Sequence, residues 1–218
     1  MINQKYQHIW TQILQSSKIN GEQEKQFLKY LQLLLEENRK YNLTAITNVD
    51  DVMLDHFADS LSILQHHDMS NIQKLIDVGS GGGFPGIPLA IMLPNIEICL
   101  IEVNLKKVYF LKLVAETLEL KNVTVRSDDW RTFLRSTPEK LQKDESDGRN
   151  VLVVARASLQ VDELLRMFKP SSHLKNGTLV YWASKKWVPT VQEKEYLKSC
   201  VEYTVGQKQR NLCFFKFS

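Results

Sequence analysis

A glycine-dense turn between two apolar runs has the residue types and spacing best suited to chemistry. Residues 75–88 read LIDVGSGGGFPGIP, with Gly79, Gly81 and Gly83 at alternate positions and Phe84 directly after them. Glycine permits positive φ and close approach to a ligand, and a helix start presents unpaired N–H groups. The context of strand, turn and helix therefore predicts a nucleotide-type site. The G-x-G-x-G spacing differs from the G-x-G-x-x-G of dinucleotide turns, and a purely structural turn is the alternative.

An acidic residue, Glu102, closes the next expected strand. It follows the turn by about 20 residues, the distance at which an acidic side chain can accept hydrogen bonds from both hydroxyls of a ribose. The alternative is an exposed strand end or an ion-pair partner for Lys106 or Lys107. The turn and this carboxylate together favour a bound nucleoside.

Side chains after the third and fourth expected strands complete the candidate site. Trp130, next to Arg131, is placed to stack on an adenine ring, and simple core packing is its alternative. Arg156 is the candidate catalytic residue, because it ends a central strand, where open α/β sheets bind ligands. Its guanidinium can bind a carboxylate, a phosphate or the hydrogen-bond acceptors of a base. An ion pair with Asp162 or Glu163 is the structural alternative.

These residues need a parallel sheet to bring them together. The periodicity is helical before residue 72 and alternates between short β-rich and amphipathic runs after it, so we expect a helical extension at 1–71 and a core at 72–218. Strands are expected at residues 74–78, 97–102, 123–127, 151–155, 178–183, 201–205 and 212–217. Helices are expected at 86–92, 105–118, 130–136 and 159–168, with three more before residue 72, and a polar loop at 137–149.

This order predicts a seven-stranded, mostly parallel, doubly wound α/β sheet. Its last two strands are separated only by residues 206–210 and should form an antiparallel hairpin at a sheet edge.

Composition excludes several classes of protein. Hydrophobic residues make up 43% and charged residues 24% of 218 residues, which excludes a disordered, collagen-like or coiled-coil chain. The net charge of +3 is too small to indicate nucleic-acid binding by itself. Basic clusters at residues 39–41, 185–187 and 208–210 are candidate RNA contacts, with solvated surface as the alternative.

The three cysteines, Cys99, Cys200 and Cys213, are widely separated. We expect neither a disulfide framework nor a CxxC metal site, and no metal at all. A reducing compartment suits such cysteines. The first residues lack the pattern of a signal peptide and no run is long enough to cross a membrane, so a cytoplasmic protein is expected.

His56, Asp59 and Ser60 resemble a triad in composition but not in spacing. His56 and Ser60 are four residues apart on one expected helix, whereas triads assemble from separate elements. We expect this helix to cover the cofactor pocket, with His56 or Asp59 bonding to the glycine turn. Core packing by the adjacent Phe57 and Leu61 is compatible with that position.

The order of strand, G-x-G-x-G turn, acidic strand end and terminal hairpin resembles a class I, Rossmann-like, S-adenosylmethionine-dependent methyltransferase. Four stretches are similar to the glucose-inhibited division protein B family: YNLTAI at residues 41–46, HFADSL at 56–61, the glycine turn with its FPGIP tail, and ARA at 155–157. The family methylates N7 of a guanine in small-subunit ribosomal RNA. The resemblance runs from about residue 41 to the terminal hairpin.

The resemblance implies S-adenosylmethionine as methyl donor and an enzyme that acts on ribosomal RNA or an assembling particle. We also expect the protein to be a monomer. It implies cofactor contacts by Gly79, Phe84, Trp130, Arg131 and Arg156. The chain departs from the family pattern in three places. Arg131 stands where an acidic residue is usual, Ser158 replaces a phenylalanine, and Ala183-Ser184 stand where a lysine is usual.

Guanine N7 has a lone pair and no proton, so its methylation needs no general base. The enzyme must hold N7 in line with the methyl group and sulfur, a proximity effect of roughly 7 to 11 kcal/mol. Two other functions stay open: a nicotinamide-dependent oxidoreductase on the same sheet, and an RNA-binding protein without activity. Binding of NAD(H), or of ribosomal RNA without S-adenosylmethionine, would distinguish them.

Overall fold

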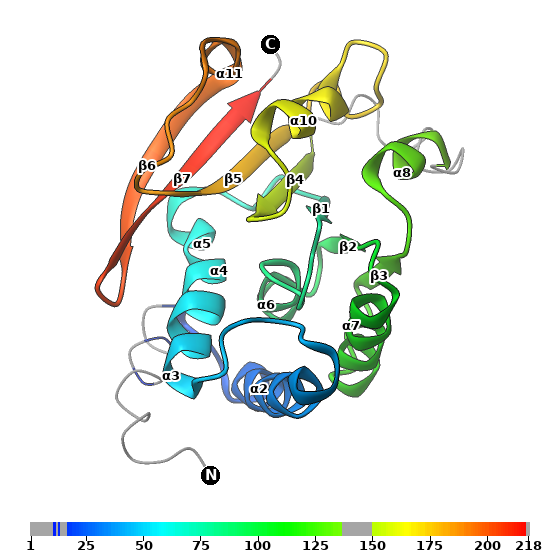
Figure 1. Ribbon diagram of the computed structural model, residues 1–218, viewed down its shortest axis with the longest axis vertical. Coiled ribbons are helices and arrows are strands. Elements are labelled where there is room, and N and C mark those ends of the chain that lie inside the picture. Colours follow the sequence, from blue (N-terminus) through cyan, green and yellow to red (C-terminus); the bar gives the residue numbers. More distant parts are fainter. Residues whose placement is uncertain (1–10, 12, 14–16, 137–149, 217–218) are drawn as a thin grey trace.

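A seven-stranded sheet forms the centre of the computed structural model, which describes residues 11, 13, 17–136 and 150–216 (Figure 1). The strand order is β3-β2-β1-β4-β5-β7-β6. The strands are β1 (Lys74–Val78), β2 (Glu97–Ile101), β3 (Val123–Arg126), β4 (Val151–Arg156), β5 (Thr178–Ser184), β6 (Leu197–Val205) and β7 (Lys208–Lys216). The first five are parallel, whereas β7 runs antiparallel to both β5 and β6. The predicted fold class, including the terminal hairpin, is confirmed.

Helices cover both faces of the sheet (Figure 1). Before β1 the described helices are α2 (Gly21–Tyr41), α3 (Val49–Asp51), the π-helix η1 (Val52–Ala58), α4 (Asp59–Leu61) and α5 (Ile63–His66). Within the core they are α6 (Gly86–Met92), α7 (Leu105–Thr117), α8 (Trp130–Ser136), α10 (Val161–Leu165), the 3-10 helix η2 (Arg166–Phe168) and α11 (Val191–Tyr196).

Alternation along the strands creates two cores. Leu75 of β1 faces a cluster that includes α2, η1, α6 and α7, whereas its neighbour Ile76 faces a second cluster that includes α8, α10 and η2. Successive strand side chains point to opposite faces, and strands buried on both faces are nearly continuous in apolar residues. The result is a three-layer arrangement with the sheet in the middle.

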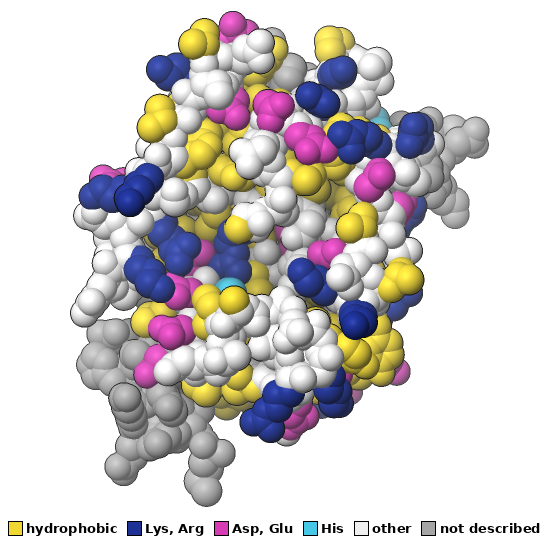
Figure 2. Space-filling model, viewed as in Figure 1, with side chains coloured by type: hydrophobic (Ala, Val, Ile, Leu, Met, Phe, Trp, Pro, Cys, Tyr) yellow, Lys and Arg dark blue, Asp and Glu magenta, His cyan; other side chains and the backbone are white. Residues whose placement is uncertain are grey.

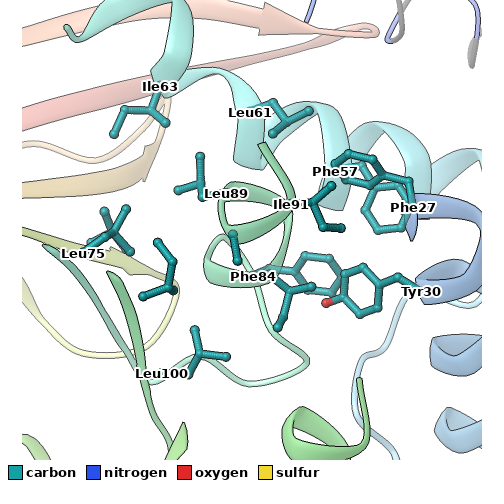
Figure 3. Packing of buried hydrophobic residues seen from close by; sticks show 14 of the residues in the cluster. Phe27, Tyr30, Phe57, Leu61, Ile63, Leu75, Phe84, Leu89, Ile91 and Leu100 are labelled. Carbon is teal, nitrogen blue, oxygen red and sulfur yellow. The ribbon is translucent and has the colours of Figure 1, made fainter. Parts of the chain in front are cut away.

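Aromatic side chains join the N-terminal helices to the glycine turn (Figure 3). Tyr30 of α2 stacks on Phe84 and on Phe57 of η1, with ring centroids 5.4 Å apart in both pairs. The Tyr30 hydroxyl donates to the Gly82 carbonyl at 2.5 Å. The N-terminal helices and the sheet thus share one hydrophobic core. The proposed boundary between residues 71 and 72 stays a prediction.

Several boundaries differ from those predicted. The hairpin strands begin earlier than expected, at Leu197 and Lys208, and the short helix α11 was not predicted. The helix expected at 159–168 is split into α10 and η2. The loop expected at 137–149, and most of the first expected helix, lie outside the described residues. Of the apolar residues that suggested this first helix, Ile9, Ile13 and Leu14, only Ile13 is described, and it is buried.

The expectation that the cysteines would not be joined by disulfides was wrong for one pair. Cys200 of β6 and Cys213 of β7 are paired directly across the hairpin and form a disulfide. Cross-strand partners of an antiparallel pair lie close enough for their side chains to meet. The two cysteines are 13 positions apart in sequence, so only the register of the hairpin brings them together.

Candidate active site

A cavity of about 650 Å³ opens at the carboxyl ends of β1, β2 and β4. This is the point in the strand order where the chain reverses direction across the sheet, the usual place for ligands in open α/β sheets. The volume lies within the range of small-molecule sites. Figure 2 shows the hollow near the centre of this face, with Lys and Arg side chains on both sides of it. Of the predicted site residues, the cavity is lined by Gly79, Gly81, Phe84, Glu102, Trp130, Arg131 and Arg156.

The glycine turn forms one wall of the cavity. Gly79, Gly81 and Gly83 all have positive φ, of 74°, 59° and 100°. A Cβ atom built on Gly81 would meet only the Gly79 carbonyl oxygen, at 3.9 Å, so the cavity side of Gly81 is open. Gly83 is not among the lining residues. A Cβ there would lie 2.6 Å from the Tyr30 hydroxyl, so Gly83 lets α2 pack against the turn.

Glu102 lies beside the glycine turn, directly after β2. One carboxylate oxygen accepts from the Gly81 backbone N–H at 2.9 Å, and the other accepts from the Asn104 N–H at 2.8 Å. The described contacts of Glu102 include no ion pair with Lys106 or Lys107, so that alternative does not hold. A carboxylate oxygen can accept more than one hydrogen bond, which leaves Glu102 able to accept from ligand hydroxyls.

Trp130 and Arg131 bound the same end of the cavity. Trp130 is 7% exposed and belongs to the second core cluster, and its Nε1–H donates to Glu163 at 3.2 Å. The Arg131 guanidinium lies 4.5 Å from the centre of the Trp130 ring and donates to the same carboxylate at 2.6 Å. Trp130 therefore serves both as core and as cavity wall. Glu163 fixes the orientation of both side chains.

Arg156 occupies the other end of the cavity, held by the π-helix. Its Nη1 donates to the Asp55 carbonyl at 2.7 Å and to the Asp59 carboxylate at 2.9 Å, and its Nη2 lies 2.9 Å from His56 Nδ1. The guanidinium is 5.2 Å from the centre of the Phe84 ring. The proposed pairing with Asp162 or Glu163 is wrong, because Asp59 on an element about 100 residues earlier is the partner.

His56 stacks on Phe84, with ring centroids 4.2 Å apart and an interplanar angle of 16°. Burial, assisted by the Arg156 charge, lowers the pKa of His56 to about 3, so the imidazole is neutral at physiological pH. The expected hydrogen bond from His56 or Asp59 to the glycine turn is replaced by this ring contact. The Ser60 hydroxyl donates to the His56 carbonyl at 2.5 Å and not to its ring, which rules out a triad.

The C-terminal hairpin supplies residues that sequence reasoning did not connect to the site. Tyr203 donates to Asp59 at 2.6 Å, and Arg210 and Lys208 donate to Asp55 at 2.9 and 2.5 Å. Asp55 and Asp59 are four residues apart on a helix, and Lys208 and Arg210 are two apart on a strand, so each pair shares a face. The spacing therefore predicts an acidic face on the helix and a basic face on the strand, but it does not predict that the two faces contact each other.

Thr44 and Leu43 also line the cavity. Their stretch, YNLTAI, was noted for its resemblance to the family, but neither residue was predicted to belong to the site. Within the described ranges, no group of at least three His, Cys, Asp or Glu side chains is arranged to hold a metal ion. No helix of that part of the chain is both long enough and apolar enough to span a membrane.

A family model described as rRNA small subunit methyltransferase G (GidB) matches residues 23–213. The match includes the helices before β1, the glycine turn and the hairpin. This chain belongs to the GidB family. The predicted family resemblance is confirmed.

GidB relatives named "Ribosomal RNA small subunit methyltransferase G" match over most of the chain. The protein from Carboxydothermus hydrogenoformans is 36% identical over 71% of this chain, and the match spans 63% of that relative, less than two thirds of its length. The protein from the Aster yellows witches'-broom phytoplasma is 40% identical over 70% of this chain and 68% of its own length. The protein from Streptococcus suis is 34% identical over 84% and 75%.

Solved structures support the fold. A SAM-dependent methyltransferase from Aquifex aeolicus matches 76% of this GidB chain and 94% of its own, with a TM-score of 0.51 and 18% identity. The N-terminal domain of human METTL16 in complex with SAH matches 83% and 78%, with a TM-score of 0.50 and 14% identity. At these identities the likeness concerns the fold alone.

Proposed function

We propose that this chain transfers a methyl group from S-adenosylmethionine to N7 of a guanine in small-subunit ribosomal RNA. The proposal rests on family membership combined with the geometry of the cavity. This GidB-family chain has an open cavity at the carboxyl ends of β1, β2 and β4, lined by the glycine turn and Glu102. The names of the relatives specify ribosomal RNA of the small subunit as their substrate.

The residues present fit an adenosyl sulfonium. Gly81 leaves open space beside the backbone, and Glu102, which accepts from the Gly81 N–H, is the acceptor for the ribose hydroxyls. Trp130 and Arg131 would bound the adenine, and Gly79, Phe84 and Arg156 line the same cavity. Gly83, also predicted to bind the cofactor, acts through the shape of the turn. When bound, this cofactor supplies an activated methyl group.

The substrate end requires alignment and no proton transfer. Held by the glycine turn and Glu102, S-adenosylmethionine would supply an activated methyl group for the lone pair of guanine N7, and the methylated base would carry a positive charge. Arg156 lies at this end, and the buried Asp59 carboxylate offsets its charge. That offset matters because an unpaired cation would repel the methylated base. Arg156 is then available as a hydrogen-bond donor toward a neutral acceptor.

We further propose that the enzyme is a cytoplasmic monomer whose substrate is ribosomal RNA, free or in an assembling particle. The basic side chains on both sides of the hollow suit a polyanion (Figure 2). Size-exclusion chromatography with light scattering tests the monomer. Methyl-transfer rates on naked RNA and on small-subunit particles identify the form of the substrate.

A radiolabelled methyl-transfer assay on small-subunit particles lacking the modification, followed by mapping of the labelled base, tests the function. Gly81→Leu should abolish transfer because the side chain enters the cofactor space. Gly81→Ala is the matched control, since it has the same left-handed φ but adds only a methyl group. Label on a base other than guanine, or binding of NAD(H) in place of S-adenosylmethionine, contradicts the proposal.

A further inference from the structure

The contacts around His56 determine which of its ring nitrogens carries the proton. Arg156 Nη2 lies 2.9 Å from His56 Nδ1, and a guanidinium can only donate hydrogen bonds. Nδ1 must therefore be the acceptor, and in a neutral imidazole the proton then resides on Nε2. The lowered pKa of His56 agrees with a neutral ring.

This tautomer determines the role of the Thr44 hydroxyl. His56 Nε2 lies 2.9 Å from Thr44 Oγ1, so the Nε2–H donates to it, and the Ile46 backbone N–H donates to the same oxygen at 3.1 Å. A hydroxyl has two lone pairs and one proton. Both lone pairs are occupied by these two donors. The Thr44 hydroxyl is left with its proton as its one remaining hydrogen-bonding function.

Thr44 lies on the Arg156 side of the cavity, because its hydroxyl bonds to His56, which contacts Arg156 and Phe84. It lines the cavity together with Leu43, Ile46, His56 and Arg156. The backbone holding Thr44 is itself anchored, because the Thr44 N–H donates to Asn38 Oδ1 at 2.9 Å. A hydroxyl donor whose oxygen and whose backbone N–H are both hydrogen-bonded is preorganised for an acceptor on the substrate.

Guanine presents such an acceptor beside its reacting atom. On the major-groove edge, guanine has O6 next to N7, whereas adenine has an amino group, a donor, at the same place. N7 must face the methyl group, so O6 is the neighbouring atom left for recognition. A hydroxyl that can only donate matches guanine O6. It cannot accept from the amino group of adenine.

We propose that Thr44 is a specificity-determining residue whose hydroxyl donates to guanine O6, oriented by the relay from Arg156 through His56. The inference rests on the proposed function and deepens it. It assigns the choice of guanine over adenine to one hydroxyl, with Arg156 acting on that hydroxyl through His56 in addition to its own place in the cavity.

Thr44→Val and Thr44→Ser test the proposal in the full-length protein. Valine has a similar shape but no hydroxyl, so kcat/KM on unmodified small-subunit particles should fall roughly 10- to 100-fold. The Kd for S-adenosylhomocysteine, measured by calorimetry, should stay unchanged. Thr44→Ser keeps the donor and should retain activity within a few-fold of the unsubstituted protein, roughly the range expected when a hydroxyl is preserved.

A substrate analogue separates recognition from packing. In particles reconstituted with 2-aminopurine at the target guanine, N7 is present but O6 is missing. Thr44→Val should then cause no further loss, because the hydrogen bond is already absent. If the variant slows both substrates equally, Thr44 acts only through packing and the proposal is overturned.

The tautomer is tested without activity. Nitrogen-15 NMR of labelled protein should show His56 protonated on Nε2 and unprotonated on Nδ1, and the opposite tautomer overturns the relay even if transfer occurs. Unaltered activity of a folded Thr44→Val variant overturns the role of Thr44 and leaves the proposed function intact. Absence of guanine methylation by the unsubstituted protein overturns both.

Discussion

Asp77 and His56 are buried close to the glycine turn, and burial moves their pKa values in opposite directions. It lowers the pKa of His56 to about 3 and raises that of Asp77 to about 7. Asp77 Oδ2 accepts from the Gly86 N–H at 3.0 Å, but Oδ1 is buried and makes no hydrogen bond with the described residues. The site therefore contains a neutral histidine and a carboxyl group that binds its proton more tightly than an exposed aspartate does.

Asp77→Asn should make the free energy of unfolding less sensitive to pH. Folded Asp77 binds its proton more tightly than the unfolded chain does, so its contribution to stability is lost as pH rises from about 4 to about 7. Asparagine keeps an acceptor for Gly86 and does not ionise. Urea unfolding at a series of pH values should show the free energy of unfolding of the variant rising relative to that of the unsubstituted protein between about pH 4 and about pH 7.

His56 has the opposite effect on stability, since its lowered pKa makes the protein less stable as pH falls from about 6.5 toward 3. It is present in both proteins of the Asp77 comparison, so its titration cancels in the difference. A difference that is flat between pH 4 and 7 would show that Asp77 is ionised in the folded protein.

Glu102→Gln should weaken cofactor binding roughly 10- to 100-fold, because hydrogen bonds to a charged acceptor contribute about 1.5 to 3 kcal/mol. The amide retains one oxygen for the Gly81 or Asn104 N–H but loses the charge and the second acceptor. Calorimetry with S-adenosylhomocysteine measures the change. Glu97→Gln, at the exposed start of the same strand, is the control and should bind normally.

At the scale of elements, the terminal hairpin holds η1 and α4 against the sheet. The Asp59 carboxylate is fully buried and is shared by Tyr203 of β6, Arg210 of β7 and Arg156 of β4. Trp182 of β5 donates to the Asp59 backbone carbonyl at 2.9 Å. Residues from four strands thus converge on one residue. Breaking this cluster should affect both stability and the position of Arg156.

Tyr203→Phe should destabilise the protein by about 1 to 3 kcal/mol, because it removes a hydrogen bond from a buried carboxylate. It should also lower kcat of methyl transfer more than it changes the affinity for S-adenosylhomocysteine, since it acts at the Arg156 end. Tyr109→Phe, on the exposed side of α7, is the control and should change stability by less than about 0.5 kcal/mol. Equal effects of the two substitutions would contradict a role for the hairpin.

At the scale of the whole molecule, the cavity joins segments that are far apart in the chain, from Leu43 to Arg210. A ligand that occupies it binds the folded state and not the unfolded chain, and so stabilises the fold. S-adenosylhomocysteine at a hundredfold excess over its Kd should add about 2.7 kcal/mol, which raises Tm by roughly 5 to 11 °C for a chain of this size.

Differential scanning fluorimetry measures this shift. Gly81→Leu should show little or none of it, because its side chain occupies the ligand space. NAD(H) at the same concentration should leave Tm unchanged. A full shift with Gly81→Leu would place the ligand elsewhere in the molecule.

The sequence by itself determined the order of the strands, the terminal hairpin and part of the cavity lining. These depend on local rules: alternation in strands such as 74–78, glycine at positive φ, and an acidic strand end at Glu102. Carboxyl ends of parallel strands meet at one edge, so local placement was enough to bring Gly81, Glu102 and Arg156 together.

Only the tertiary structure decided which side chains meet. Arg156 pairs with Asp59, not with a nearby acid, and Cys200 joins Cys213, because sheet register and packing bring distant residues into contact. The bonds of His56 and Thr44 likewise depend on the π-helix η1 and the loop after α2 meeting beside the glycine turn. Charges and hydrogen-bond donors act over a few ångströms in space, and no spacing along the chain encodes that distance.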